Sequence, residues 1–75
     1  MSEPPRVKPR EVMHALLRAG FVEVASKGSH RQFRRPQGGG RVTVPVHEGR
    51  DVPPGTLRSI LRQAGLTAEE FTALQ

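Results

Sequence analysis

The fold is decided by residues 21–35, FVEVASKGSHRQFRR. Residues 21–27 are rich in side chains that favour strands, and Gly28-Ser29 fits the two-residue turn of a β-hairpin. Residues 30–35 then continue as a second strand. The stretch therefore predicts a hairpin in which His30 is the first residue after the turn and stands among cationic side chains.

The segments before and after this hairpin add a helix and a third strand. Apolar residues at helical spacing, a proline in the first turn and a glycine at the end predict a helix over Pro9–Ala19. The glycine-rich residues 36–40 form a connection. Alternation over Arg41–Val46 predicts a third strand, in which Pro45 indicates a sheet edge or the end of the strand.

Two further helices are expected in the C-terminal part of the chain. Pro54–Ala64 carries apolar residues at i, i+3, i+4 and i+7 and is followed by Gly65, a typical helix stop. Thr67 and Glu70 have the spacing of a capping box, which predicts the start of a short last helix.

The predicted order is helix, three strands, helix and a terminal helix, an α+β arrangement written αβββα(α). The natural packing places both main helices on one face of a three-stranded antiparallel sheet and leaves the other face to solvent. Double-stranded-RNA-binding domains share this architecture. A fold of this size hosts many functions, so the function has to be argued from particular residues.

Composition sets bounds on what the protein does. Its 75 residues make one domain, with residues 1–8 expected as a flexible, proline-rich lead and residues 9–75 as the folded part. The absence of cysteine excludes disulfides and thiolate chemistry and favours a cytoplasmic protein. No apolar run approaches the roughly 18 residues that a membrane span needs. The net charge of +5 indicates a polyanion or an acidic protein as partner.

Strand alternation divides the hairpin side chains between two faces of the sheet. Phe33 should face the helices, so His30, Gln32 and Arg34 should share the open face. In the third strand the valines should take the core side, which turns His47 outward. Two of the three histidines are therefore expected on the same face.

Exposed histidines beside cations suit the cleavage of RNA without a metal ion. The reaction needs a base for the 2′-hydroxyl proton, an acid for the leaving 5′-oxygen and cations for the phosphate. Histidine serves both proton transfers because its pKa lies near neutrality. His30 is the candidate catalytic residue and His47 a possible second acid or base. The candidate RNA- or phosphate-binding residues are Lys27, Gly28, Ser29, Arg31, Gln32 and Arg34.

The same residues leave other interpretations open. His30 and His47 also fit histidines that only hydrogen-bond near a strand end, and His14 fits a solvated helix residue. The basic face also suits an RNA-binding module without catalysis, or a docking surface for an acidic protein. His47 with Glu48 and Asp51 offers possible cation ligands, but no second histidine at helical spacing completes a zinc site, so no metal or other cofactor is expected.

In four motifs the chain closely resembles the HicA family of mRNA interferase toxins. They are Gly20-Phe21, Lys27-Gly28-Ser29-His30-Arg31, VTVPVH at residues 42–47 and PGTLRSIL at residues 54–61. The resemblance runs from about Pro9 to Phe71. It implies a double-stranded-RNA-binding-domain-like fold, ribonuclease activity on single-stranded mRNA that arrests translation, and neutralisation by a HicB-type antitoxin. It also implies that His30 is the catalytic histidine, whereas the role of His47 rests on strand alternation alone.

Overall fold

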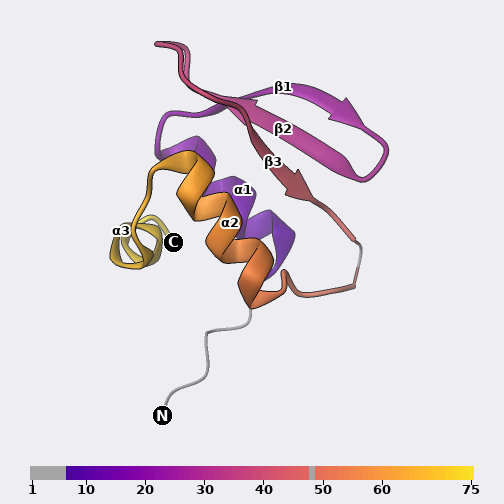
Figure 1. Cartoon of the computed structure of the whole chain (residues 1–75). Helices are drawn as coiled ribbons and strands as arrows, with labels where there is room; N and C mark the ends of the chain where they lie inside the picture. The colour runs from indigo at the N-terminus through magenta and orange to yellow at the C-terminus, as the bar shows by residue number, and fades with distance from the viewer. Residues whose placement is uncertain (1–6, 48) are drawn as a thin grey trace.

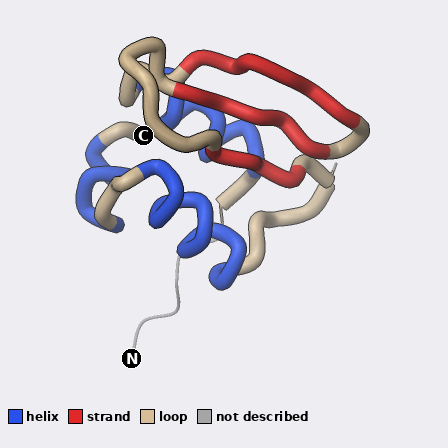
Figure 2. The backbone as a smooth tube through the Cα atoms, turned by 45° about the horizontal axis from the view of Figure 1, so that its top comes forward, coloured by secondary structure: helices blue, strands red, loops and turns tan. Residues whose placement is uncertain are grey.

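The three strands form one antiparallel sheet, and the helices lie against one side of it (Figure 1, Figure 2). The computed structural model describes residues 7–47 and 49–75. The elements in chain order are α1 (Pro9–Arg18), β1 (Val22–Lys27), β2 (His30–Arg34), β3 (Val42–Pro45), α2 (Pro54–Ala64) and α3 (Ala68–Ala73). The predicted α+β fold is confirmed, and its arrangement is that of double-stranded-RNA-binding domains.

The helix boundaries follow the local signals in the sequence. α2 ends at Gly65, whose φ of 71° is left-handed, and the next N–H, of Leu66, donates to the carbonyl of Leu61 at 2.9 Å. At the start of α3 the N–H of Thr67 donates to Glu70 Oε1 at 2.8 Å, and the N–H of Glu70 donates to Thr67 Oγ1 at 3.0 Å. The predicted capping box is therefore confirmed.

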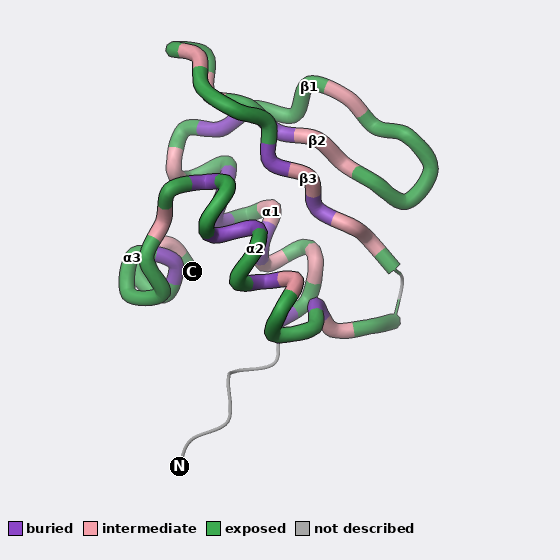
Figure 3. The backbone as a smooth tube through the Cα atoms, in the orientation of Figure 1, coloured by how far each residue is buried: buried purple, intermediate pink, exposed green. Residues whose placement is uncertain are grey.

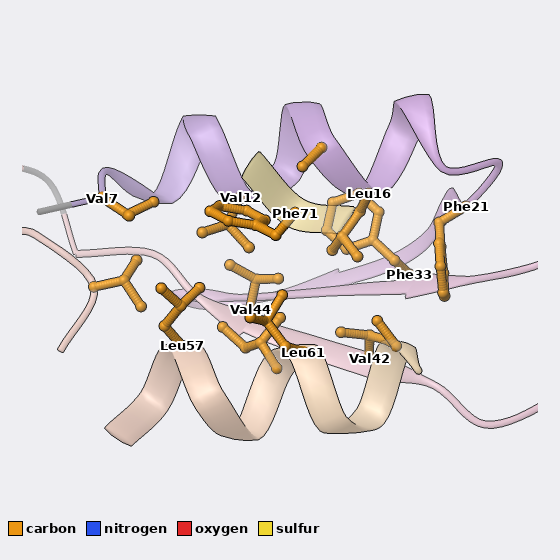
Figure 4. Close-up of a cluster of buried hydrophobic side chains, with 14 residues drawn as sticks. Val7, Val12, Leu16, Phe21, Phe33, Val42, Val44, Leu57, Leu61 and Phe71 are labelled. Atoms are coloured by element: carbon orange, nitrogen blue, oxygen red, sulfur yellow. The ribbon is translucent and has the colours of Figure 1, made fainter. Parts of the chain in front are cut away.

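The hydrophobic core lies between the sheet and the helices (Figure 3, Figure 4). Phe33, Val42 and Val44 project from β2 and β3 and are at most 1% exposed. They pack with the apolar stripes of the helices, whose buried members are Val12, Ala15 and Leu16 of α1, Leu57, Ile60, Leu61 and Ala64 of α2, and Phe71 of α3. Burial of this cluster on one side commits the other side of the sheet to solvent.

β3 is an edge strand that ends at Pro45, as the proline indicated. Its outer edge is partly covered by α2, because the backbone N–H of Thr43 donates to Gln63 Oε1 at 3.2 Å. This bond satisfies a donor that an edge strand would otherwise leave to another chain. The edge is thus fixed against the helix layer.

Val7, two residues before the predicted boundary, belongs to the packed domain. Val7 is 4% exposed and forms an antiparallel bridge with Val52. In this bridge the N–H of Val52 donates to the carbonyl of Val7 at 2.7 Å. Lys8 precedes α1, its carbonyl accepts from the Glu11 N–H, and its ammonium lies 2.8 Å from Asp51. The expected flexible lead therefore does not include residues 7 and 8, because distant residues, Val52 and Asp51, pair with them. The rest of that lead, residues 1–6, lies outside the described residues.

None of the helices in residues 7–47 and 49–75 has the length and apolar character needed to cross a membrane.

Candidate active site

The Gly28–Ser29 turn holds His30 at the tip of the hairpin, where it lies between the last residue of β1 and the last residue of β3. Gly28 has a φ of 59°, and no non-glycine residue of the described chain has a positive φ, which matches a type II′ hairpin turn. The turn makes Lys27 the direct cross-strand partner of His30. On the other side His30 pairs with Pro45, and the N–H of Val46 donates to the carbonyl of Ser29 at 2.6 Å. The backbone around His30 is therefore fixed from both sides.

Strand alternation places His30 on the face of the sheet that the helices do not cover. Phe33 pairs with Val42 and both are buried in the core, so these positions face the helices. His30 and Gln32 lie three residues and one residue before Phe33, and an odd separation along a strand puts them on the opposite face. Both His30 and Arg34 are exposed, as alternation predicts. The predicted division of β2 between two faces is confirmed.

A β-bulge brings Glu23 to the helix-facing side of the hairpin, where strand alternation already places Arg31. The register shifts between Glu23 and Ala25, so Glu23 lies opposite Phe33 and shares the helix-facing side with Arg31. Arg31 Nε and Nη2 donate to Glu23 Oε2 and Oε1 at 2.5 and 2.6 Å. This hydrogen bond and the guanidinium charge lower the pKa of Glu23, and the carboxylate raises the pKa of Arg31. The guanidinium of Arg31 is therefore already paired with a carboxylate of its own chain, that of Glu23.

The cations of the open face lie at different distances from His30. Lys27 is its direct partner, which brings the two Cβ atoms to about 5 Å. Arg34 is four residues further along β2, about 13 Å away. Gln32 lies between them, and its Oε1 accepts from Arg41 Nη1 at 2.7 Å. Among the cations that the described residues place on the open face, Lys27 is therefore the nearest to His30 along the ladder, and Arg34 and Arg41 lie further along β2.

Arg41 was not among the residues that sequence patterns singled out for this face. It precedes β3, and its hydrogen bond to Gln32 brings its guanidinium onto the outer surface of β2. The signal that could have found it is parity, because residue 41 alternates with the buried Val42. Gly28 and Ser29, which the turn motif did single out, are exposed at the hairpin tip.

His47 does not simply continue the face of His30. The expectation that it does requires alternation to run through residue 47, but β3 ends at Pro45. The exposed His47 instead lines an open pocket together with residues at the start of α1. The alternative cation site at His47, Glu48 and Asp51 has one member, Glu48, outside the described residues, and Asp51 lies 2.8 Å from the Lys8 ammonium.

The part of the chain that forms α1, the sheet and α2 matches a class of bacterial toxin-antitoxin proteins. A family model described as HicA toxin of bacterial toxin-antitoxin matches residues 9–66, which include α1, the whole sheet and α2. The chain therefore belongs to the HicA toxin family, and membership implies an antitoxin partner. No curated protein matches the chain.

Proposed function

We propose that this HicA-family toxin is an endoribonuclease that cleaves single-stranded mRNA in the cytoplasm without a metal ion, with His30 as general acid or base. The observation that carries the proposal is the pairing of His30 with Lys27 at an exposed hairpin tip. An imidazole, which can serve as a general acid or base, then stands beside a cation that attracts phosphate. The net charge of +5 favours the approach of a polyanion.

The chemistry follows from what an imidazole can do beside a ribose. Neutral His30 takes the proton of the 2′-hydroxyl, and the oxygen attacks the adjacent phosphorus. The bond from phosphorus to the 5′-oxygen breaks, and that oxygen receives a proton from an imidazolium, either protonated His30 or His47. The products are a 2′,3′-cyclic phosphate and a 5′-hydroxyl end. General acid or base catalysis of this kind contributes about 10²- to 10⁴-fold.

The surrounding residues have distinct proposed roles. Lys27 stabilises the extra negative charge that develops on the reacting phosphate, and the exposed turn at Gly28 and Ser29 offers backbone donors beside it. Gln32 and Arg34 bind the next nucleotides along β2. Arg31 is the least suited of the proposed phosphate ligands, because Glu23 occupies its guanidinium.

His47 remains the candidate for the second proton transfer. Residue 47 follows Val46, whose N–H donates to the carbonyl of Ser29 beside His30, so the chain that carries His47 leaves the sheet next to the hairpin tip. We propose that a phosphate bound at this end of β3 is reached by both imidazoles. One histidine would then act as base and the other as acid.

This surface offers few side chains that could recognise particular bases. The chain has no tyrosine or tryptophan, and all three phenylalanines are buried. Bases therefore have no exposed Phe, Tyr or Trp ring to stack on, and binding depends on phosphates, imidazoles and arginine planes. This favours an enzyme with weak sequence preference over a non-catalytic module that selects particular RNAs. A HicB-type antitoxin would neutralise the toxin by covering the same basic face.

The test is cleavage of one labelled single-stranded sequence as RNA, as DNA and as fully 2′-O-methylated RNA, all in EDTA. We expect cleavage of the RNA alone, with cyclic phosphate at the new 3′ ends, because only this substrate has a free 2′-hydroxyl. Cleavage of the DNA, or of the methylated strand, would contradict the proposed mechanism. Binding of all three without cleavage would favour the RNA-binding module.

A further inference from the structure

An open pocket lies where the end of β3 meets the start of α1. Its volume is about 380 Å³, within the range of small-molecule sites. Arg10 and Met13 line it from the helix side, and Val46, His47 and Arg50 line it from the chain that leaves β3. Met13 and Val46 are half-buried and pack against the core, so they form an apolar floor, and the arginines are exposed at the rim.

The cationic side chains of this pocket differ in whether a carboxylate is paired with them. Lys8 also lines it, but its ammonium lies 2.8 Å from an oxygen of Asp51. Arg10 and Arg50 form no ion pair with any carboxylate in residues 7–47 and 49–75. Two guanidinium groups and an exposed imidazole thus border an apolar floor. Guanidinium groups match the bidentate geometry of phosphate oxygens.

One side of the pocket is lined by residues that follow directly in sequence after β3, the strand that pairs with His30. Pro45 is the partner of His30, the N–H of Val46 donates to the carbonyl of Ser29 at 2.6 Å, and Val46 then forms part of the pocket floor. Val46 and Met13 pack against the core, so the pocket opens on the helix side of the sheet, whereas His30 lies on the open face. A strand of RNA with its reacting phosphate at His30 therefore has to turn round this end of β3 to enter the pocket.

We propose that this pocket binds one nucleotide of the RNA, close to the phosphate that is cleaved. Arg10 and Arg50 hold its phosphate, and its base lies on Met13 and Val46. The inference rests on the proposed function and extends it, because it supplies an anchor for the substrate away from the reacting group. RNA is favoured over an acidic protein segment because an apolar floor beneath two phosphate-matching cations suits a base and its phosphate together.

The test separates binding from cleavage. Single-stranded RNA is titrated against the His30→Ala protein, which removes the proposed catalyst, and against the same protein with Arg10→Ala, Arg50→Ala or both. The matched control is Arg58→Ala with Arg62→Ala, two exposed arginines of α2 outside the pocket. Thermal unfolding of each variant verifies that it is folded.

We expect each pocket substitution to weaken RNA binding by about tenfold, which is the scale of one charge-assisted hydrogen bond. The slope of log K against log salt should become shallower by about 0.7 for each phosphate that is no longer neutralised. The α2 control should keep the parent affinity and slope. In the protein with His30 intact, Met13→Gln should raise KM more than it lowers kcat, because it disturbs the floor and leaves the reacting groups in place.

The two proposals fail in different ways. Unchanged RNA affinity in the folded Arg10→Ala, Arg50→Ala double variant overturns the nucleotide pocket, even if the toxin cleaves RNA. Loss of antitoxin binding with unchanged RNA affinity also overturns it and assigns the pocket to the antitoxin. Absence of cleavage by the wild type, with the expected loss of affinity in the pocket variants, overturns the proposed enzyme and leaves an RNA-binding pocket.

Discussion

Lys27 and His30 are cross-strand partners on the two sides of the Gly28–Ser29 turn. The pairing puts an ammonium group and an imidazole on the same face of the sheet at the exposed tip of the hairpin. Because the turn has two residues, the pairing tolerates no insertion without a change of register. The chemistry that we propose depends on this spacing more than on the overall charge.

Lys27→Ala should lower the rate of RNA cleavage by about 10²-fold, the scale expected when one donor to a developing anion is removed. Lys27→Arg should retain part of the rate because the charge remains. The measurement is single-turnover cleavage at saturating protein. Arg58→Ala, on the exposed surface of α2, is the control for a general loss of charge. Equal rates for Lys27→Ala and Arg58→Ala would remove Lys27 from the reaction.

Gly28→Ala should destabilise the fold by about 1 kcal/mol, because an L residue is strained at a φ of 59°. It should also slow cleavage by distorting the turn beside His30. Gly55→Ala is the matched control, since that glycine lies in α2, has no positive φ and has open space around its Cβ position. It should stabilise the protein by up to about 1 kcal/mol. Urea unfolding measures both, and the idea of a strained turn fails if the two variants shift in the same direction.

The Glu23–Arg31 pair should make the stability depend on pH in the acid range. The hydrogen bond and charge of Arg31 hold the pKa of Glu23 below its ordinary value of 4.5. The folded state therefore binds fewer protons than the unfolded state. Its extra stability is present above pH 4.5 and is lost as the pH falls through the lowered pKa.

Glu23→Gln should abolish this contribution, so the free energy of unfolding should fall less steeply below pH 4.5 than in the wild type. The difference should be small because both side chains reach solvent. Glu69→Gln, in the first turn of α3, is the control. Identical acid profiles for the wild type and Glu23→Gln would show that the pair does not persist in solution.

Val7→Ala should cost about 1–2 kcal/mol of stability, since Val7 is 4% exposed and packs in the core. Val22→Ala, at a valine that is 45% exposed, should change stability by less than about 0.5 kcal/mol. Denaturant unfolding of the two variants compares them directly. Equal stabilities would mean that the packed domain starts after Val7.

The parts of the fold that depend on near neighbours could be predicted from the sequence. Gly28-Ser29, the Thr67–Glu70 capping box and the stop at Gly65 each act over a few residues, and all lie where they were expected. The apolar side of β2 could be predicted as well, because Phe33 is its only large apolar residue and the period of a strand is two.

Features that depend on distant partners could not be predicted. Val7 lies in a proline-rich stretch without periodicity, and its bridge to Val52 and its burial in the core hold it in place. The bulge beside Val24 leaves no turn residue as a signal, yet it moves Glu23 to the side of Arg31. The pocket joins Arg10 to Arg50, which are far apart in the chain, so no local pattern indicates it.

The most direct test of the account is the cleavage of single-stranded RNA in EDTA by the wild type and by His30→Ala, with folding of both verified by circular dichroism. The account predicts that the wild type cuts the RNA and that His30→Ala is slower by about 10²- to 10⁴-fold. Cleavage by the folded His30→Ala protein at the wild-type rate, or loss of wild-type cleavage in EDTA, would contradict it.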